Sequence, residues 1–281
     1  MEIARNTAEL EASISDPPAF VATMGALHAG HLALVEAAKR TGHRTVLSIF
    51  LNPTQFAEGE DLTTYPTDVD RDLEMAREAG VDVVFLPEVE TIYPEGLQRA
   101  TLQAGKLTLP DVATHPGLED AARPHFFGGV CLVVGRLLDM VRPTVALFGE
   151  KDYQQLQVVS AMVKLDPNRF AGVTVAGCPT IRDPDGLAMS SRNVHLEGSD
   201  REQALGLSRA LERAAGANRP DEAERLMVET LEDHGARLEY AAVRDATTLE
   251  PVQRLDRPCR ALIAAEVGGV RLIDNASIGR G

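Results

Sequence analysis

The sequence lacks the features of a disulfide-stabilised, zinc-binding or membrane-spanning protein. Its three cysteines, Cys131, Cys178 and Cys259, are far apart and show no metal-binding spacing, so we expect buried free thiols. No apolar run is long enough for a transmembrane helix. The first ten residues, MEIARNTAEL, contain no apolar signal-peptide core, and we therefore expect a cytoplasmic protein.

Positive charge is also scarce. Lysine and arginine together number 28 against 42 aspartates and glutamates, which gives a formal net charge of −14. This balance argues against broad binding of nucleic acids or anionic membranes. The 44% of hydrophobic and 25% of charged residues are typical of a globular protein. A phosphate-binding site in so acidic a chain needs its own local cations.

Several common catalytic motifs are absent as well. The sequence contains no HExxH, no CxxC, no P-loop ending in Gly-Lys-Ser or Gly-Lys-Thr, and no nucleophile elbow. These absences argue against a zinc peptidase, a dithiol oxidoreductase, a P-loop NTPase and a serine hydrolase. The residues that could carry chemistry therefore lie in other motifs.

What is present is a regular alternation of strand-like and helical patterns. We predict strands at 19–22, 45–51, 81–86, 144–148 and 173–176, and helices at 69–79, 129–141 and 153–165. Strands that alternate with helices pair in parallel through right-handed crossovers, so residues 1–178 are predicted to form a doubly wound α/β domain. Ligands of such sheets bind at the carboxyl ends of the strands.

The pattern changes after Pro179. Helical patterns at 200–217 and 220–235 precede strand-like pieces at 238–243, 261–267 and 270–273. Residues 179–281 are therefore predicted to form a smaller α+β domain. The segment 107–122 is predicted to be irregular, either a flap over a site or a plain surface loop.

The most informative motif is TMGALHAGH, residues 23–31. It follows a predicted strand and opens a helical pattern, so His28 and His31 project to the same side of a helix start. Free backbone N–H groups and the helix dipole favour an anion there, and Gly25 and Gly30 allow the backbone to approach a ligand closely. The motif predicts a nucleotide-phosphate site; the plain alternative is a strand–turn–helix joint with surface histidines.

Two further motifs follow predicted strands. In NPTQF, Gln55 either binds a substrate hydroxyl and carboxylate through its amide or caps the loop. In FGEKDYQQL, Lys151 lies where a strand ends and a helix begins, so it can neutralise a phosphate; the alternative is a solvated pair with Glu150. Asp152 either caps the helix or binds ribose hydroxyls, and Gln155 would face inward with Gln55.

The polar loop AMSSRN, residues 188–193, supplies two hydroxyls and Arg192. These groups suit a mobile phosphate clamp, although such triplets are also common on ordinary surfaces. In RPHFFGGV, Arg123 would add a cation near the opening. We predict that His115, His195 and His234 are surface residues.

Taken together and in order, TMGALHAGH, SIFLNPTQF, FGEKDYQQLQVV and DGLAMSSRN closely resemble the pantothenate synthetase (pantoate–β-alanine ligase) family. The resemblance covers residues from about 20 to 200 and, more loosely, the C-terminal part. It implies a cytoplasmic homodimer with a Rossmann-like domain and a C-terminal lid. The family is similar to other HxGH nucleotidyltransferases and to class I aminoacyl-tRNA synthetases. The AMSSR segment resembles the mobile KMSKS loop of those synthetases.

The resemblance implies a reaction in two steps. The carboxylate of pantoate attacks the α-phosphate of Mg-ATP, giving pantoyl adenylate and pyrophosphate. The amine of β-alanine then attacks the acyl carbon, giving pantothenate and AMP. Both steps require aligned reactants and screened negative charge. Mg²⁺ would be held largely by phosphate oxygens.

The resemblance also implies individual roles. The catalytic residues would be His28, His31, Lys151 and Arg192, with the histidines stabilising phosphates in the transition state. Gln55 and Gln155 would bind pantoate, and Gln55 would also guide the β-alanine amine. ATP would contact all four catalytic residues and the following others: Met24, Gly25, Ala26, Leu27, Ala29, Gly30, Gly149, Glu150, Asp152, Ile181, Met189, Ser190 and Ser191.

One segment departs from the family pattern. The family usually has His-Phe after Arg-Pro-x, whereas here Phe126 occupies the histidine position and His125 lies one residue earlier. Two other functions stay open. One is an adenylyltransferase for another acid or for a phosphorylated cofactor, and the other is a non-catalytic module that senses ATP or pantoate.

Overall fold

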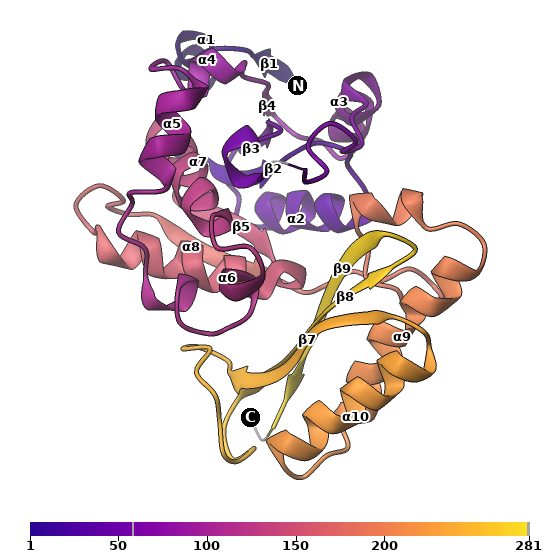
Figure 1. Cartoon of the computed structure of the whole chain (residues 1–281). Helices are drawn as coiled ribbons and strands as arrows, with labels where there is room; N and C mark the ends of the chain where they lie inside the picture. Colours follow the sequence, from indigo (N-terminus) through magenta and orange to yellow (C-terminus); the bar gives the residue numbers. More distant parts are fainter. Residues whose placement is uncertain (58, 280–281) are drawn as a thin grey trace.

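Two β-sheets organise the protein in a computed structural model that describes residues 1–57 and 59–279 (Figure 1). The larger sheet has the order β1-β4-β3-β2-β5-β6, and all its neighbouring strands are parallel. Its strands are β1 (Glu2–Ala4), β2 (Ala19–Thr23), β3 (Thr45–Ile49), β4 (Val83–Phe85), β5 (Val145–Gly149) and β6 (Thr174–Cys178). In Figure 1 this sheet and its helices occupy the upper half of the molecule.

Alternate residues of the central strands enter two different cores. Phe20 and Val46 pack on the side of α1 (Thr7–Ser13), α7 (Phe126–Val141) and α8 (Tyr153–Leu165). Val21 and Leu47 pack on the side of α2 (Ala29–Arg40) and α3 (Val69–Glu78). Since successive side chains of a strand point to opposite faces, the sheet is covered on both faces. The predicted doubly wound α/β fold is confirmed.

The smaller sheet is antiparallel and has the order β7-β8-β9. Its strands are β7 (Arg237–Asp245), β8 (Cys259–Val267) and β9 (Val270–Ile278), and α9 (Ser199–Ala214) and α10 (Pro220–Asp233) pack against it around a separate core. This arrangement confirms the predicted α+β part. A domain boundary between residues 178 and 179 stays a prediction.

Several short elements escaped the sequence-based prediction. They are β1, α1, α4 (Val89–Ile92) and α5 (Leu97–Ala104), and α7 begins at Phe126 rather than at Gly129. The segment 107–122 contains η2 (Asp111–Ala113) and α6 (Glu119–Ala122). Side-chain atoms of Gln154 bond the carbonyl of Val112 and the N–H of Glu119. Such single turns depend on tertiary partners, which is why no local pattern predicts them.

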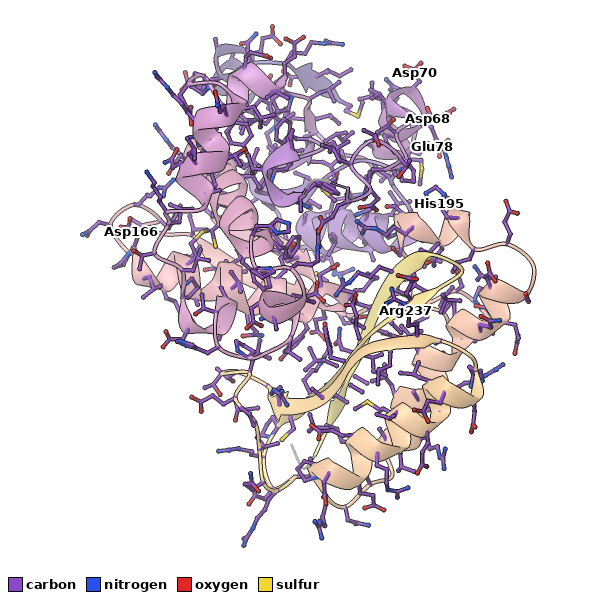
Figure 2. All side chains as sticks on the ribbon, viewed as in Figure 1. Asp68, Asp70, Glu78, Asp166, His195 and Arg237 are labelled. Carbon is purple, nitrogen blue, oxygen red and sulfur yellow. The ribbon has the colours of Figure 1, made fainter. Side chains whose placement is uncertain are left out.

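The outer surface carries much of the acidic charge. Figure 2 shows Asp68, Asp70 and Glu78 beside α3 at the outer edge of the molecule. Among the described residues no helix has both the length and the apolar character needed to cross a membrane. Cys131, Cys178 and Cys259 are buried free thiols, as predicted.

Candidate active site

The predicted site segments meet at one large cavity of about 1290 Å³. Thr23 of β2 lies opposite Ile49 of β3, and Val21 of β2 lies opposite Leu147 of β5, so the loops after these strands emerge side by side. β9 contributes another part of the wall. The predicted residues that line the cavity are Met24, His28, Gly30, His31, Gln55, Gly149, Lys151, Asp152, Gln155, Ile181, Met189, Ser190, Ser191 and Arg192.

The two histidines form a reciprocal cap at the start of α2. The N–H of Gly30 donates to Nδ1 of His28 at 3.1 Å, and the N–H of His28 donates to Nδ1 of His31 at 3.3 Å. A ring nitrogen that accepts a hydrogen bond carries no proton, so each neutral ring keeps its proton on Nε2. A Cβ at residue 30 would lie 2.8 Å from Cε1 of His28, which explains why a glycine stands there.

Both imidazoles are neutral at physiological pH. Burial, helped by the charge of Lys151, lowers the pKa of His28 from 6.5 to about 4. The pKa of His31 falls from 6.5 to about 3, mainly because the ring is buried and further because of electrostatic repulsion by His28 and Lys151. The structure presents two Nε2–H donors, because desolvation disfavours the charged form.

The loop before α2 is supported by Asp72 of α3, a residue outside the predicted site motifs. Both carboxylate oxygens of Asp72 accept backbone N–H groups, from Ala26 at 2.8 Å and Leu27 at 2.7 Å. Gly25 and Ala26 adopt positive φ values of 86° and 49°, and a Cβ at residue 25 would lie 2.9 Å from Asp72. The N–H groups of Ala26 and Leu27 are therefore engaged by Asp72 and are not available to a bound anion.

Five residues expected to contact ATP do not line the cavity. They are Gly25, Ala26, Leu27, Ala29 and Glu150. Leu27 is a core residue. The carboxylate of Glu150 instead pairs with Arg260 at 2.9 Å, so the solvated Lys151–Glu150 pair is not the arrangement in this structure.

Gln55 is held by a buried polar network around Asn52. Its Oε1 accepts from Asn52 Nδ2 at 3.0 Å, and its Nε2 lies 3.0 Å from Sδ of Met24. The hydroxyl of Tyr93 donates to Asn52 Oδ1 at 2.6 Å, and the Thr54 N–H donates there as well. The contact to sulfur is weak, so Nε2 is the group that Gln55 can offer to a ligand.

Lys151 and Asp152 lie in η3 (Glu150–Asp152), directly after β5. The ammonium group of Lys151 is 3.8 Å from the Asp152 carboxylate. Asp152 makes no side-chain bond that would cap α8, which leaves its carboxylate available to ligand hydroxyls. On the first turn of α8, Gln154 and Gln155 both border the cavity, but Gln154 is buried and its side chain accepts a hydrogen bond from the first residue of α6.

The AMSSRN segment lies across the cavity and continues into η4 (Ser191–His195). The Ser191 hydroxyl donates to the carbonyl of Ala26 at 3.2 Å. The guanidinium of Arg192 forms two bonds with Asp61, at 2.6 and 3.1 Å, and its carbon lies 5.4 Å from the centre of the Tyr65 ring. A triphosphate bound by Arg192 must therefore compete with the Asp61 carboxylate.

Other polar groups lie unused or already engaged at the rim. Within the part of the chain that the structure describes, the buried Thr180 hydroxyl has no hydrogen-bond partner. Thr180 lies next to Ile181, whose carbonyl accepts a hydrogen bond from the Met189 N–H.

Arg123 binds Glu60 at 2.6 Å and the Gln55 carbonyl at 3.3 Å, and it stacks 4.2 Å over Phe126. Arg123 is thus a clamp between loops rather than a free cation at the opening.

The three histidines assigned to the surface differ from one another. His115 and His195 are exposed, and Figure 2 shows His195 beyond α2. His195 also borders the cavity. His234 is half-buried between α9 and α10, where its ring contacts the Thr230 carbonyl and Arg209. His234 is therefore only partly exposed at the surface, because its ring packs against Gly206.

The fold and the cavity define a doubly wound α/β protein with a ligand-sized cavity at the carboxyl ends of its strands, next to the HxGH motif. A profile of the family described as Pantoate-beta-alanine ligase matches residues 2–277. The chain belongs to the pantoate–β-alanine ligase family.

Individual relatives agree with this assignment. The chain is 50% identical to a pantothenate synthetase of Nitrobacter winogradskyi over 266 residues, covering 92% of this chain and 90% of that one. It is similar to the crystal structure of pantothenate synthetase from Thermus thermophilus, with a TM-score of 0.89, 41% identity and coverage of 98% and 99%. A Francisella tularensis pantoate–β-alanine ligase, described as complexed with beta-gamma ATP and β-alanine, matches with a TM-score of 0.77, 34% identity and coverage of 98% and 97%.

Proposed function

We propose that the protein joins pantoate to β-alanine at the expense of ATP, through pantoyl adenylate, and releases pyrophosphate and AMP. One observation carries the proposal: two neutral imidazole donors, Lys151, Arg192 and two glutamine amides line the same cavity. The beta-gamma ATP and β-alanine named for the Francisella relative are ligands of matching chemistry.

In the first step the carboxylate of pantoate attacks the α-phosphorus of ATP, and the bond to the bridging oxygen of pyrophosphate breaks. Gln55 and Gln155 hold pantoate, with Gln55 exchanging its contact to Met24 sulfur for a substrate oxygen. The Nε2–H groups of His28 and His31 donate to phosphate oxygens as charge moves onto them, and Lys151 screens the remainder. The step moves no proton, so a neutral imidazole suits it.

In the second step the neutral amine of β-alanine attacks the acyl carbon, AMP leaves with the bonding electrons of the anhydride, and the proton lost by the amine nitrogen passes to a phosphate oxygen of AMP or to water. The structure supplies alignment rather than a nucleophilic side chain. A cavity walled by both sheets would also keep water away from the adenylate. The Thr180 hydroxyl and the Asp152 carboxylate are suited to the nucleoside part of ATP or AMP.

We also propose that Mg²⁺ arrives with ATP and is bound mainly by its phosphates. Across residues 1–57 and 59–279, no group of three or more His, Cys, Asp or Glu side chains is placed to hold a metal ion. Arg192 and Lys151 each have a carboxylate nearby, in Asp61 and Asp152, so a polyphosphate needs further positive charge. A divalent cation supplies that charge when bound. A cytoplasmic homodimer is proposed on the family resemblance alone.

The test is to incubate the purified protein with ATP, Mg²⁺, pantoate and β-alanine and to measure pyrophosphate, AMP and pantothenate. We expect pyrophosphate release to depend on pantoate, and AMP release to depend on β-alanine. Without β-alanine, the adenylate should accumulate on the enzyme. Pyrophosphate release with another acid but not with pantoate would favour a different adenylyltransferase, and thermal stabilisation by ATP without turnover would favour a sensor.

A further inference from the structure

Two consecutive residues of β9 connect the C-terminal sheet to two separate segments of the cavity. Asp274 and Asn275 are each only 3% exposed. They lie opposite Ile263 and Leu262 of β8, which belong to different apolar clusters on the two faces of the sheet. Because neighbouring strand residues point to opposite faces, each of the two can reach a different loop.

Asn275 reaches the loop that carries Lys151. Its Nδ2 donates to the carbonyl of Glu150 at 2.9 Å and to the carbonyl of Lys151 at 2.8 Å. Its Oδ1 accepts from Nε of Arg260 at 2.6 Å, and the same guanidinium binds the Glu150 carboxylate. One amide thus holds the backbone of η3, and a buried arginine holds the amide.

Asp274 reaches the segment that carries Ile181 and leads to Arg192. Its two oxygens accept from Arg182 at 2.7 and 3.0 Å. Arg182 pairs with Ala188 in a short antiparallel bridge, and Met189 N–H donates to the carbonyl of Ile181. Asp274 therefore anchors the base of the turn from which AMSSR extends.

We propose that Asp274 and Asn275 are positioning residues for the adenylation step, an inference that rests on the proposed function. Their polar side-chain atoms are engaged by the protein, so they act through Lys151 and Arg192 rather than on the substrate. The segment that carries Lys151 and the segment that leads to Arg192 are therefore held relative to each other by two adjacent residues of β9. The C-terminal sheet is thereby part of the machinery that forms the adenylate, in addition to covering the site.

The decisive variant is Asn275→Asp. It keeps the acceptor for Arg260 but places a carboxylate oxygen against the carbonyls of Glu150 and Lys151. Rapid-quench single turnovers separate the two chemical steps: the pyrophosphate burst reports adenylate formation, and mixing preformed enzyme-bound adenylate with β-alanine reports amine attack. We expect adenylate formation to slow by about tenfold to a hundredfold, whereas amine attack, which involves no polyphosphate, keeps its rate.

Asn275→Ala and Asp274→Asn repeat the test at one loop each, and they replace Asn275→Asp if that variant unfolds at the assay temperature. Asp274→Asn should also raise the KM for ATP while leaving the KM for pantoate unchanged. Arg237→Gln is the matched control, because the side chain of Arg237 (Figure 2) is exposed on the edge strand β7 of the same sheet, where it pairs with Glu266.

The possible failures are distinguishable. A wild-type protein without pantoate-dependent pyrophosphate release overturns the proposed function itself. An active wild type whose folded Asn275 and Asp274 variants form adenylate at the normal rate overturns only the positioning role. Equal slowing of both chemical steps also overturns it, since that result indicates general loss of structure.

Discussion

The imidazole rings of His28 and His31 lie against each other across the first turn of α2. The backbone N–H of His28 donates to Nδ1 of His31, and the ring centroids lie 4.0 Å apart. Two charged rings at this separation would repel each other, and burial disfavours the charge further. The HxGH motif of this chain therefore presents hydrogen-bond donors whose orientation is set by the backbone, and it carries no net charge near neutral pH.

This arrangement predicts a pH-dependent stability. The pKa values of His28 and His31, about 4 and 3 in the folded protein, lie below that of an exposed histidine in the unfolded chain, about 6.5. The unfolded state therefore binds more protons below about pH 6.5, and the free energy of unfolding falls as the pH decreases from there towards 4. Each imidazole contributes at most about 1.4 kcal/mol per pH unit. Urea unfolding at several pH values measures how steeply the free energy of unfolding changes with pH. A His28→Gln, His31→Gln double variant should show a smaller change. An equal change in the wild type and the double variant would contradict the pKa shifts.

Replacing Lys151 by alanine should abolish turnover with a milder loss of ATP binding. Its ammonium group acts where charge develops on the phosphates, and removal of one such group costs about a hundredfold or more in kcat. Steady-state assays and calorimetric titration with ATP measure the two effects. Lys164→Ala, an exposed change at the other end of α8, is the control. A normal kcat in Lys151→Ala would refute the role of the lysine.

Gln55→Ala should act mainly on pantoate. The amide is buried and pre-oriented by Asn52, so its loss removes a positioned hydrogen bond and should raise the KM for pantoate by about tenfold. The KM for ATP should change little. Gln157→Ala on α8, outside the cavity lining, serves as the control. If all three substrates are affected equally, the loop has collapsed and Gln55 is not specific for pantoate.

Releasing Arg192 from Asp61 should strengthen ATP binding. In Asp61→Asn the guanidinium loses a charged partner with which triphosphate competes, and we expect the KM for ATP to fall by a few-fold. Asp70→Asn makes the same change in net charge at an exposed position of α3, away from the cavity (Figure 2). Equal effects of the two substitutions would show that only the overall charge matters.

Asp72→Asn should weaken both the fold and the chemistry. An amide can accept one N–H through its oxygen but opposes the other, so either Ala26 or Leu27 loses its partner. The expected loss in the free energy of unfolding is about 1–3 kcal/mol. Because the strained loop leads directly into the His28 cap, kcat should fall as well. Thermal unfolding and steady-state kinetics test this prediction, and a variant with normal stability would show that the loop needs no support from α3.

Local patterns were sufficient for the elements that position the site. The apolar run before TMGALHAGH forms β2, and the helical pattern after it forms α2, because period and flanking glycines are properties of neighbouring residues. Gln55 and Lys151 were placed after strands for the same reason. The partners Asp72 and Asn275 were missed, since no pattern around either residue indicates which distant backbone groups it will bind.

The order of the motifs, the alternation of strands with helices and the loops that follow the strands were determined by the sequence, since each depends on residues that are neighbours along the chain. Only the tertiary structure decided which of these groups are charged and which are free. Burial makes the imidazoles neutral. Glu150 forms an ion pair with Arg260, and Arg192 forms one with Asp61. Charge state and pairing depend on distances and on exclusion of water between segments far apart in the chain, and folding alone sets those.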